Sequence, residues 1–216
     1  MRLFKSLFSR DGDNESPSLA TIESPKDLKI ADMLKMEFSD IPLISGQTLK
    51  VCEQRFYDLS ALENCKIVSV MEGADQRIYL STSTVNPQRP LEVAVAILPD
   101  TVFKIFDQSE FVAIFDEPDN TNHRINRKIS LAELNELQGF VAESYFQERT
   151  NEAYISSKDC RNGALAESDW TGFDYKLMVS DDRLNSIRIE VFDGGRTDVY
   201  LIAYLPLHKV EEYWPA

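Results

Sequence analysis

The sequence predicts an α+β fold, made mainly of antiparallel sheet in meanders and hairpins, with one long amphipathic helix packed on a face. Two observations carry this prediction: strand-like runs follow one another through short links, and one well-marked helix interrupts them. Residues 187–191 alternate apolar and charged side chains, which predicts a strand with Arg188 and Glu190 in solvent. Residues 199–205 are apolar throughout, which predicts a central strand reached through a tight turn at 193–196.

The composition predicts one domain in residues 24–216, preceded by a basic amphipathic start and a flexible linker in residues 1–23. The chain has 216 residues and a net charge of -13. Such a surface repels phosphate backbones, so nucleic acid is not an expected partner. Residues 11–23 are rich in Ser, Asp, Asn, Glu and Pro and have little to bury, which is typical of a linker.

The first ten residues depart from the acidic body in being both basic and apolar. On a helix their aromatic and aliphatic side chains would gather on one side, which favours weak contact with an anionic membrane surface. The membrane-contact candidates are Arg2, Phe4, Lys5, Leu7, Phe8 and Arg10. The alternatives are a disordered start and a segment that folds back onto the core.

The body opens with a predicted helix over residues 25–38, because Ser24 is a good N-cap and Pro25 a good first residue. Pro42 ends any helical run. Four strand-like runs with turn residues between them then predict an antiparallel meander. They lie at residues 49–53, 66–71, 77–82 and 91–98.

The middle of the chain is expected to be the helical part. Residues 99–120 predict a short helix and then a strand at 111–115. Residues 129–147 carry the best-marked helix, since Ser130 and Glu133 form a capping box and an apolar stripe follows. Such a stripe would lie against the sheet.

The last part is predicted as an irregular loop followed by three strands. Residues 150–168 show neither the helical nor the strand period. A strand at 175–179 leads into the hairpin of residues 187–205. Residues 208–214 are expected to form a last turn or two of helix.

The sequence contains no motif for catalysis, cofactor binding or metal binding. Its three cysteines, Cys52, Cys65 and Cys160, lack C-x-x-C spacing and are odd in number. We therefore expect neither a disulfide framework nor a zinc site, and a reducing compartment. Cys52 and Cys65 are expected to be small buried hydrophobic residues, with pairing across a hairpin as the alternative.

Two arrangements would still allow chemistry. Cys160 could act as a nucleophile with His208 as its base if the fold brought them together. The acidic residues Asp116, Glu117 and Asp119 could hold Ca²⁺ or Mg²⁺, but the spacing of an EF-hand is absent. We therefore expect no catalytic residue, no metal and no cofactor.

Three stretches carry a resemblance to a known family: LFSR at residues 7–10, DYKLMVSDD at 174–182 and SIRIEVFDGG at 186–195. In these stretches the chain resembles the YjfK-like proteins, a bacterial family of unknown function often encoded near membrane-stress proteins of the phage-shock type. The resemblance implies a cytoplasmic accessory role at the inner membrane. It implies no active-site residues.

The expected function is that of a non-enzymatic protein-interaction or accessory protein of the bacterial cytoplasm, weakly tethered to the inner membrane by residues 1–10. A protein partner is therefore expected. One alternative is an acidic inhibitor or immunity-type protein, since a strongly acidic surface would steer a basic partner. The other alternative is an enzyme with an acidic metal-dependent or Cys-based site.

Overall fold

The structure is a computed structural model that describes residues 22–59, 65–73, 76–116, 123–163 and 165–216. Its strands are β1 (Met33–Met36), β2 (Thr48–Asp58), β3 (Lys66–Glu72), β4 (Arg77–Thr82), β5 (Leu91–Ile97), β6 (Arg124–Asn126), β7 (Ser144–Ser156), β8 (Thr171–Ser180), β9 (Asn185–Phe192), β10 (Thr197–Leu205) and β11 (Val210–Trp214). Its α-helices are α1 (Pro99–Ile105) and α2 (Gln108–Asp116). Its short 3-10 helices are η1 (Pro25–Asp27), η2 (Leu131–Leu137), η3 (Cys160–Asn162), η4 (Glu167–Asp169), η5 (Asp193–Gly195) and η6 (Leu207–Lys209).

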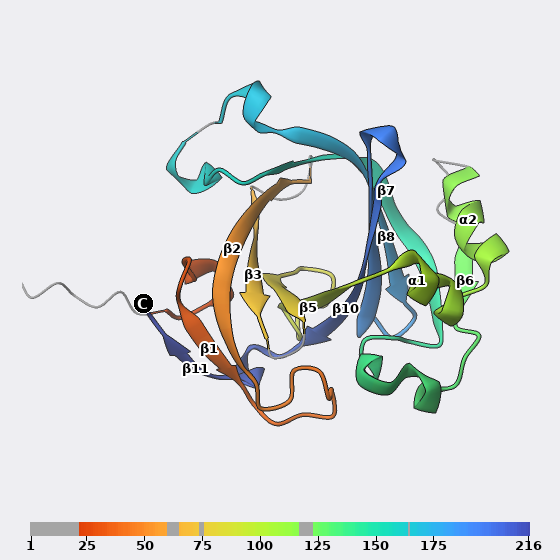
Figure 1. The fold of residues 1–216 in the computed structure, drawn as a ribbon, viewed down its shortest axis with the longest axis horizontal. Helices are drawn as coiled ribbons and strands as arrows, with labels where there is room; N and C mark the ends of the chain where they lie inside the picture. The colour runs from red at the N-terminus through yellow and green to blue at the C-terminus, as the bar shows by residue number, and fades with distance from the viewer. Residues whose placement is uncertain (1–21, 60–64, 74–75, 117–122, 164) are drawn as a thin grey trace, which may run out of the picture.

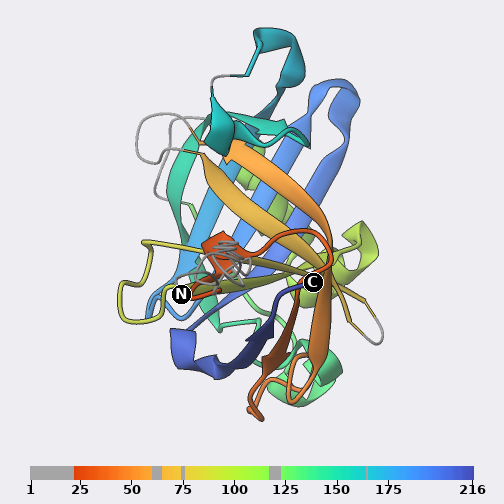
Figure 2. The same cartoon turned by 90° about the vertical axis from the view of Figure 1, so that its left-hand side faces the viewer.

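The strands form one antiparallel sheet that closes on itself (Figure 1). Its order is β11-β1-β2-β3-β4-β5-β10-β9-β8-β7-β6, and β2 pairs with β7 in addition. That pairing runs from Phe56 opposite Ser156 to Asp58 opposite Tyr154. The eight strands from β2 to β7 in this order therefore form a closed barrel, while β1, β11 and β6 extend it at the two sides. Figure 2 looks through the wall of β2 and β3, behind which the blue strands of residues 171–205 cross.

The predicted α+β fold with one long amphipathic helix is wrong. The barrel has no long helix in its described residues, where the longest one is α2, of nine residues. Apart from the strand predicted at 111–115, the strand-like runs and their antiparallel order are confirmed: they lie in β2, β3, β4, β5, β8, β9 and β10. The structure differs from the prediction in that the sheet closes on itself. An open meander leaves two edge strands unpaired, whereas in the barrel β2 and β7 pair with each other.

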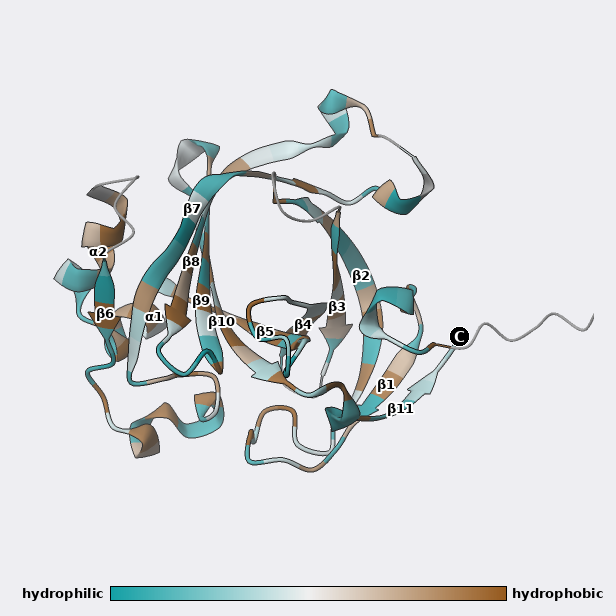
Figure 3. Cartoon of the chain, turned by 180° about the vertical axis from the view of Figure 1, so that it is seen from behind, coloured by the Kyte–Doolittle hydropathy of each residue, from teal (hydrophilic) through white to brown (hydrophobic). Residues whose placement is uncertain are grey.

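Two hydrophobic cores result, one on each side of the barrel wall. The interior core comprises Tyr57, Leu59, Val68, Val70, Tyr79, Ala94, Ala153, Phe173, Tyr175, Leu177, Val179, Phe192, Tyr200, Ile202 and Tyr204, with every strand of the barrel represented. The outer core joins the outward side chains of the strands to those of α1, α2 and η2, among them Phe106, Phe111 and Leu134. In Figure 3, α1 and α2 lie outside the ring of strands, beside β6, β7 and β8.

The predicted helix over residues 129–147 begins correctly and then stops. Its capping box is confirmed, because the Ser130 N–H donates to Glu133 Oε2 over 2.8 Å. Asn135, however, has a φ of 49°, a conformation that an α-helix excludes. The chain then turns and continues as β7, whose residues pair with β6 and β8. The ladder hydrogen bonds of a strand between two neighbours override the helical apolar stripe.

Other predicted helices are replaced by strands for the same reason. After η1, whose capping box joins Ser24 and Asp27, the chain forms β1 between β2 and β11. Residues 208–214 form η6 and then β11 rather than a helix. The loop predicted at residues 150–168 contains the second half of β7. Conversely, the strand predicted at 111–115 is helical and lies in α2.

The turn between β9 and β10 confirms the predicted hairpin. Gly194 and Gly195 have φ values of 81° and 84°, which a glycine adopts without steric cost. As predicted, β10 is central, since it pairs with β9 on one side and β5 on the other.

Replacing Gly139 by alanine is expected to destabilise the protein by roughly 1 to 3 kcal/mol, because both backbone strain and overpacking oppose the new methyl group. Gly139 has a φ of 86°, and an added Cβ would lie 2.6 Å from Ile41 Cγ1. Urea unfolding would measure this. The matched control is Gly194→Ala. Gly194 has a φ of 81°, but an added Cβ there would have no atom within 4 Å, so this variant introduces the backbone strain without the overpacking. Equal losses in the two variants would contradict the packing argument.

Candidate functional site

A chain of charged side chains crosses the barrel interior from β9 to β3. Arg188 and Glu190 extend inward from β9, and Arg188 Nε lies 3.0 Å from Glu190 Oε1. On its other side, Arg188 Nη1 lies 3.5 Å from Glu92 Oε1 of β5. The second oxygen of Glu92 lies 2.7 Å from Lys66 Nζ, at the start of β3. Two cations and two carboxylates thus alternate through the interior.

The prediction that Arg188 and Glu190 face solvent is wrong, since the side chains are 2% and 1% exposed. The alternation itself is correct: Ile187 and Ile189 belong to the outer core. The polar face of β9 is buried because the sheet closes around it. Buried charges of this kind occur in proteins when they are paired.

The guanidinium of Arg188 also packs against two aromatic rings. It lies 4.3 Å from the ring centroid of Tyr200 and 5.3 Å from that of Tyr57. Its contact with Glu190 lacks hydrogen-bond geometry, so Nε and Nη2 have no hydrogen-bond partner among the described residues. The ring faces therefore stabilise the part of the cation that donates no hydrogen bond to a described residue.

The two interior carboxyls differ in their electrostatics. Burial tends to raise the pKa of Glu92, but the charges of Lys66 and Arg188 together lower it below its ordinary value. Burial raises the pKa of Glu190, and Arg188 compensates only in part. Glu92 has two cationic neighbours where Glu190 has one close cation. Glu92 is therefore the carboxylate that holds the chain of charges together.

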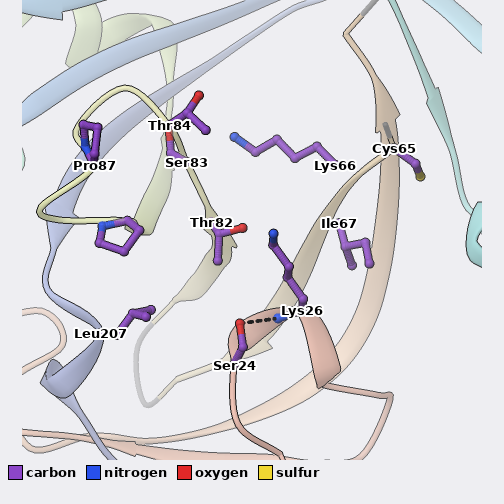
Figure 4. Close-up of a pocket in the computed structure, with 11 residues that line it drawn as sticks. Ser24, Lys26, Cys65, Lys66, Ile67, Thr82, Ser83, Thr84, Pro87 and Leu207 are labelled. Atoms are coloured by element: carbon purple, nitrogen blue, oxygen red, sulfur yellow. Dashed lines mark hydrogen bonds between the residues drawn. The ribbon is translucent and has the colours of Figure 1, made fainter. Parts of the chain in front are cut away.

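The chain of charges ends at one end of the barrel, where a groove of about 620 Å³ opens beside Lys66. The end of β4, the loop after it, η1 and η6 form its walls. Figure 4 shows Lys26 and Lys66 directed into this groove, facing the side of Thr82, Ser83 and Thr84. The residues that line it are Ser24, Lys26, Cys65, Lys66, Ile67, Thr82, Ser83, Thr84, Pro87, Pro90 and Leu207.

The chemistry of the groove differs from that of the rest of the protein. Its lining, within the described part of the chain, includes two lysines and four hydroxyl side chains and no acid, although the whole chain carries a net charge of -13. Lys66 is paired with Glu92, whereas Lys26 is exposed to solvent. Pro87, Pro90 and Leu207 supply an apolar wall. Ammonium and hydroxyl donors beside apolar surface suit an anion with an apolar part.

A second, much smaller space lies next to the groove, among side chains of the barrel interior. A cavity of about 20 Å³ lies between Lys66, Arg149, Tyr175 and Tyr204, which is room for about one water molecule. An eight-stranded barrel is just wide enough to be filled by side chains or to hold one small ligand. Of these two spaces between described residues, the groove, of about 620 Å³, is the one large enough for an organic ligand.

Two loops are tied together beside the groove. Arg183 Nε donates to the carbonyl of Val85 over 3.1 Å, and Asn86 Nδ2 donates to the carbonyl of Arg183 over 3.1 Å. These bonds hold the loop between β4 and β5 against the loop between β8 and β9. The apolar wall at Pro87 is therefore positioned before any ligand binds.

The predicted absence of a disulfide is wrong. Cys65, in the groove, is joined to Cys160 of η3, with their Cα atoms 6.6 Å apart. Cys52 is exposed rather than buried, and is the free cysteine of the described residues. The pairing escaped sequence reasoning because its partners are 95 residues apart. The Cys160 nucleophile considered above would also need a free thiol, which the disulfide removes.

The membrane-contact candidates Arg2, Phe4, Lys5, Leu7, Phe8 and Arg10 lie outside the described residues, as do Glu117 and Asp119. Their predicted roles stay predictions. Across the described residues, no helix has the length and apolarity needed to cross a bilayer. In the same residues, no three His, Cys, Asp or Glu side chains are grouped to bind a metal ion.

Sequence reasoning named neither Lys26 nor Lys66 as a site residue. A signal was present in the run Ser81, Thr82, Ser83 and Thr84, where four hydroxyl side chains end a strand. Lys26 and Lys66 are distant from this run in the sequence, and only the fold brings them to it.

Comparisons with protein-family models, with curated proteins and with solved structures found no match for this chain. The resemblance to the YjfK-like proteins therefore stays a prediction, and the groove has to be interpreted from its own chemistry.

Proposed function

We propose that this protein is a non-enzymatic binding protein whose groove takes a small organic anion with an apolar part. The observation that carries the proposal is the composition of the groove: two ammonium groups and four hydroxyl groups, with no described acid, on a strongly acidic chain. A carboxylate or a phosphate would accept hydrogen bonds from the lysines and hydroxyls. The acidic remainder of the surface would leave the groove as the place where an anion is attracted.

The two lysines have different parts in this proposal. Glu92 already fixes the ammonium of Lys66 by a contact of 2.7 Å, so Lys66 offers a preorganised donor at the inner end of the groove. Lys26 is exposed and lies on η1, where it supplies the positive charge that Glu92 does not offset. The apolar part of the ligand would lie on Pro87, Pro90 and Leu207.

The wider role expected from the sequence stays part of the proposal. A binding barrel of this kind could serve as an accessory protein of the bacterial cytoplasm with a protein partner, as the family resemblance implies. Its attachment to the inner membrane through residues 1–10 is likewise proposed. The acidic surface also keeps the inhibitor hypothesis open, since it would attract a basic protein partner.

Replacing Lys26 by glutamine is expected to weaken anion binding roughly tenfold or more, the effect of losing one charge-assisted hydrogen bond. Isothermal titration calorimetry with inorganic phosphate, octanoate and octyl phosphate would measure it. Comparing the affinities of octyl phosphate and inorganic phosphate tests whether the apolar wall contributes to binding. Comparing the affinities of octanoate and octyl phosphate tests which head group the groove prefers. Binding should weaken with added salt, because Lys26 is exposed.

The matched control is Lys50→Gln, the same change at an exposed lysine of β2 that is not part of the groove lining. Its affinity should equal that of the unchanged protein. If none of the three anions binds, or if both variants lose affinity equally, the groove is not an anion site.

A further inference from the structure

The Cys65–Cys160 disulfide joins the groove to a segment that lies between β7 and β8. Cys65 lines the groove and directly precedes Lys66. Cys160 begins η3, in residues 157–163, which we call the η3 segment. Both cysteines are partly exposed, so a small thiol can reach the bond. Exposed disulfides are the ones that tend to be labile and regulatory.

The η3 segment also contacts the wall of the groove that carries Lys26. Arg161 Nη1 donates to the carbonyl of Lys26 over 3.4 Å, and Nη2 donates to Gln54 Oε1 over 3.5 Å. Its guanidinium lies 5.7 Å from the ring centroid of Phe56. Asp159 orients it through a contact of 2.6 Å between Oδ2 and Nη2. The η3 segment thus contacts both sides of the groove, at Cys65 and at η1.

The contacts that Arg161 makes with η1 and Gln54 are weak, and the disulfide strengthens the attachment of the η3 segment. The hydrogen bonds from Arg161 to Lys26 and Gln54 are long, and the Arg161–Asp159 pair lies within the segment and does not anchor it. Partly exposed ion pairs and long hydrogen bonds stabilise a structure only weakly. The pairing of Phe56 with Ser156 and the contact of Arg161 with Phe56 also place the η3 segment near β2, and the disulfide adds the one covalent link between this segment and the groove among the described residues.

We propose that the Cys65–Cys160 disulfide is a redox switch for the groove: closed, it holds η1 and Lys26 in the binding position, and opened, it releases the η3 segment and lowers anion affinity. This proposal rests on the anion-binding function of the groove. In a reducing bacterial cytoplasm the disulfide would form only transiently, as is usual for redox-sensing disulfides in such compartments.

The reaction is a thiol–disulfide exchange with a small thiol of the glutathione class. Its thiolate attacks one sulfur, the S–S bond breaks, and the other cysteine leaves as a thiolate. A second thiol then displaces the remaining protein sulfur from the mixed disulfide. The protein gains two electrons and two protons as two thiols, and the reductant leaves as its own disulfide.

Octyl phosphate titrated into the oxidised protein and into protein reduced with dithiothreitol tests the switch. Reduction is expected to weaken binding about tenfold, the loss of one charge-assisted contact. The double variant Cys65→Ser, Cys160→Ser should behave like the reduced protein under both conditions. Cys52→Ser is the matched control, since it removes the exposed free cysteine and should keep the full redox dependence. Circular dichroism checks that each form is folded.

Hydrogen exchange of residues 157–163 and of η1 supplies a readout that does not depend on the ligand. Exchange in both should rise on reduction while exchange in β9 and β10 stays unchanged. Equal affinity in the two redox states would overturn the switch and leave the groove function standing. If no anion binds in either state, the groove function fails and the switch fails with it, and a rise in exchange would then show only that the disulfide holds the η3 segment in place.

Discussion

Replacing Glu92 by glutamine is expected to destabilise the protein by about 3 to 5 kcal/mol at neutral pH, the usual cost of removing one partner from a buried ion pair. Glu92 is 3% exposed and lies between Lys66 and Arg188. A neutral side chain would leave both cations in the barrel interior without their shared carboxylate. Urea unfolding followed by circular dichroism would measure the loss.

The pH dependence of this loss follows from the lowered pKa of Glu92. Burial opposes the charge, but Lys66 and Arg188 favour it more, so the folded pKa lies below the ordinary value of 4.5. The stabilisation is fully present above the unfolded pKa and is lost as the pH falls through the lower, folded pKa. The difference in unfolding free energy between the protein and the variant should therefore narrow below pH 4.5.

The control is Glu72→Gln, the same change at an exposed residue at the end of β3. Its unfolding free energy should change by no more than about 0.5 kcal/mol. If Glu92→Gln lowered the free energy of unfolding no more than this control does, the chain of buried charges would not stabilise the barrel.

Replacing Phe106 by alanine is expected to destabilise the protein by about 3 to 5 kcal/mol, the range for truncating a buried phenylalanine. Phe106 is fully buried in the outer core and follows α1 directly. Its ring centroid lies 5.9 Å from that of Tyr145 in β7 and 6.4 Å from that of Phe111 in α2. Removing the ring would leave a cavity between the helices α1 and α2 and the barrel wall, and the contacts of Phe106 with Tyr145 and Phe111 would be lost.

Phe38→Ala is the matched control, because its side chain is 80% exposed. The thermal midpoint of Phe106→Ala should fall well below that of Phe38→Ala in calorimetry. Comparable midpoints would mean that the helices outside the barrel contribute little to its stability.

The sequence predictions that the structure confirms concern features that depend on residues close together in the chain. The alternation in β9, the glycines between β9 and β10, and the Ser130–Glu133 capping box all appear in the structure. Each depends on neighbours a few residues away, whose side-chain spacing or backbone conformation decides the outcome. The candidate site depended on no such pattern. Lys26, Lys66 and the hydroxyl run after β4 meet only in the folded chain.

The wrong prediction of a long helix at residues 129–147 shows that a local helical pattern can be outweighed by strand pairing in the folded chain. Leu134 and Tyr145 are both buried, as a helical stripe would have them. Leu134 is buried from η2 and Tyr145 from β7, because the chain reverses at Gly139 between them. The same apolar residues thus fill the outer core from two elements, and the hydrogen bonds of β7 to its neighbours decide the geometry.

Most of the strands, their antiparallel succession, the β9–β10 hairpin and the acidity of the chain could be predicted from the sequence, because they follow from side-chain alternation, turn residues and composition. The closing of the sheet could not be predicted in this way. Closure depends on the pairing of β2 with β7, from Phe56 opposite Ser156 to Asp58 opposite Tyr154, which joins distant parts of the chain. That closure converts the polar face of Arg188 and Glu190 from a solvent-facing surface into a buried interior, and it brings the lysines of the groove together.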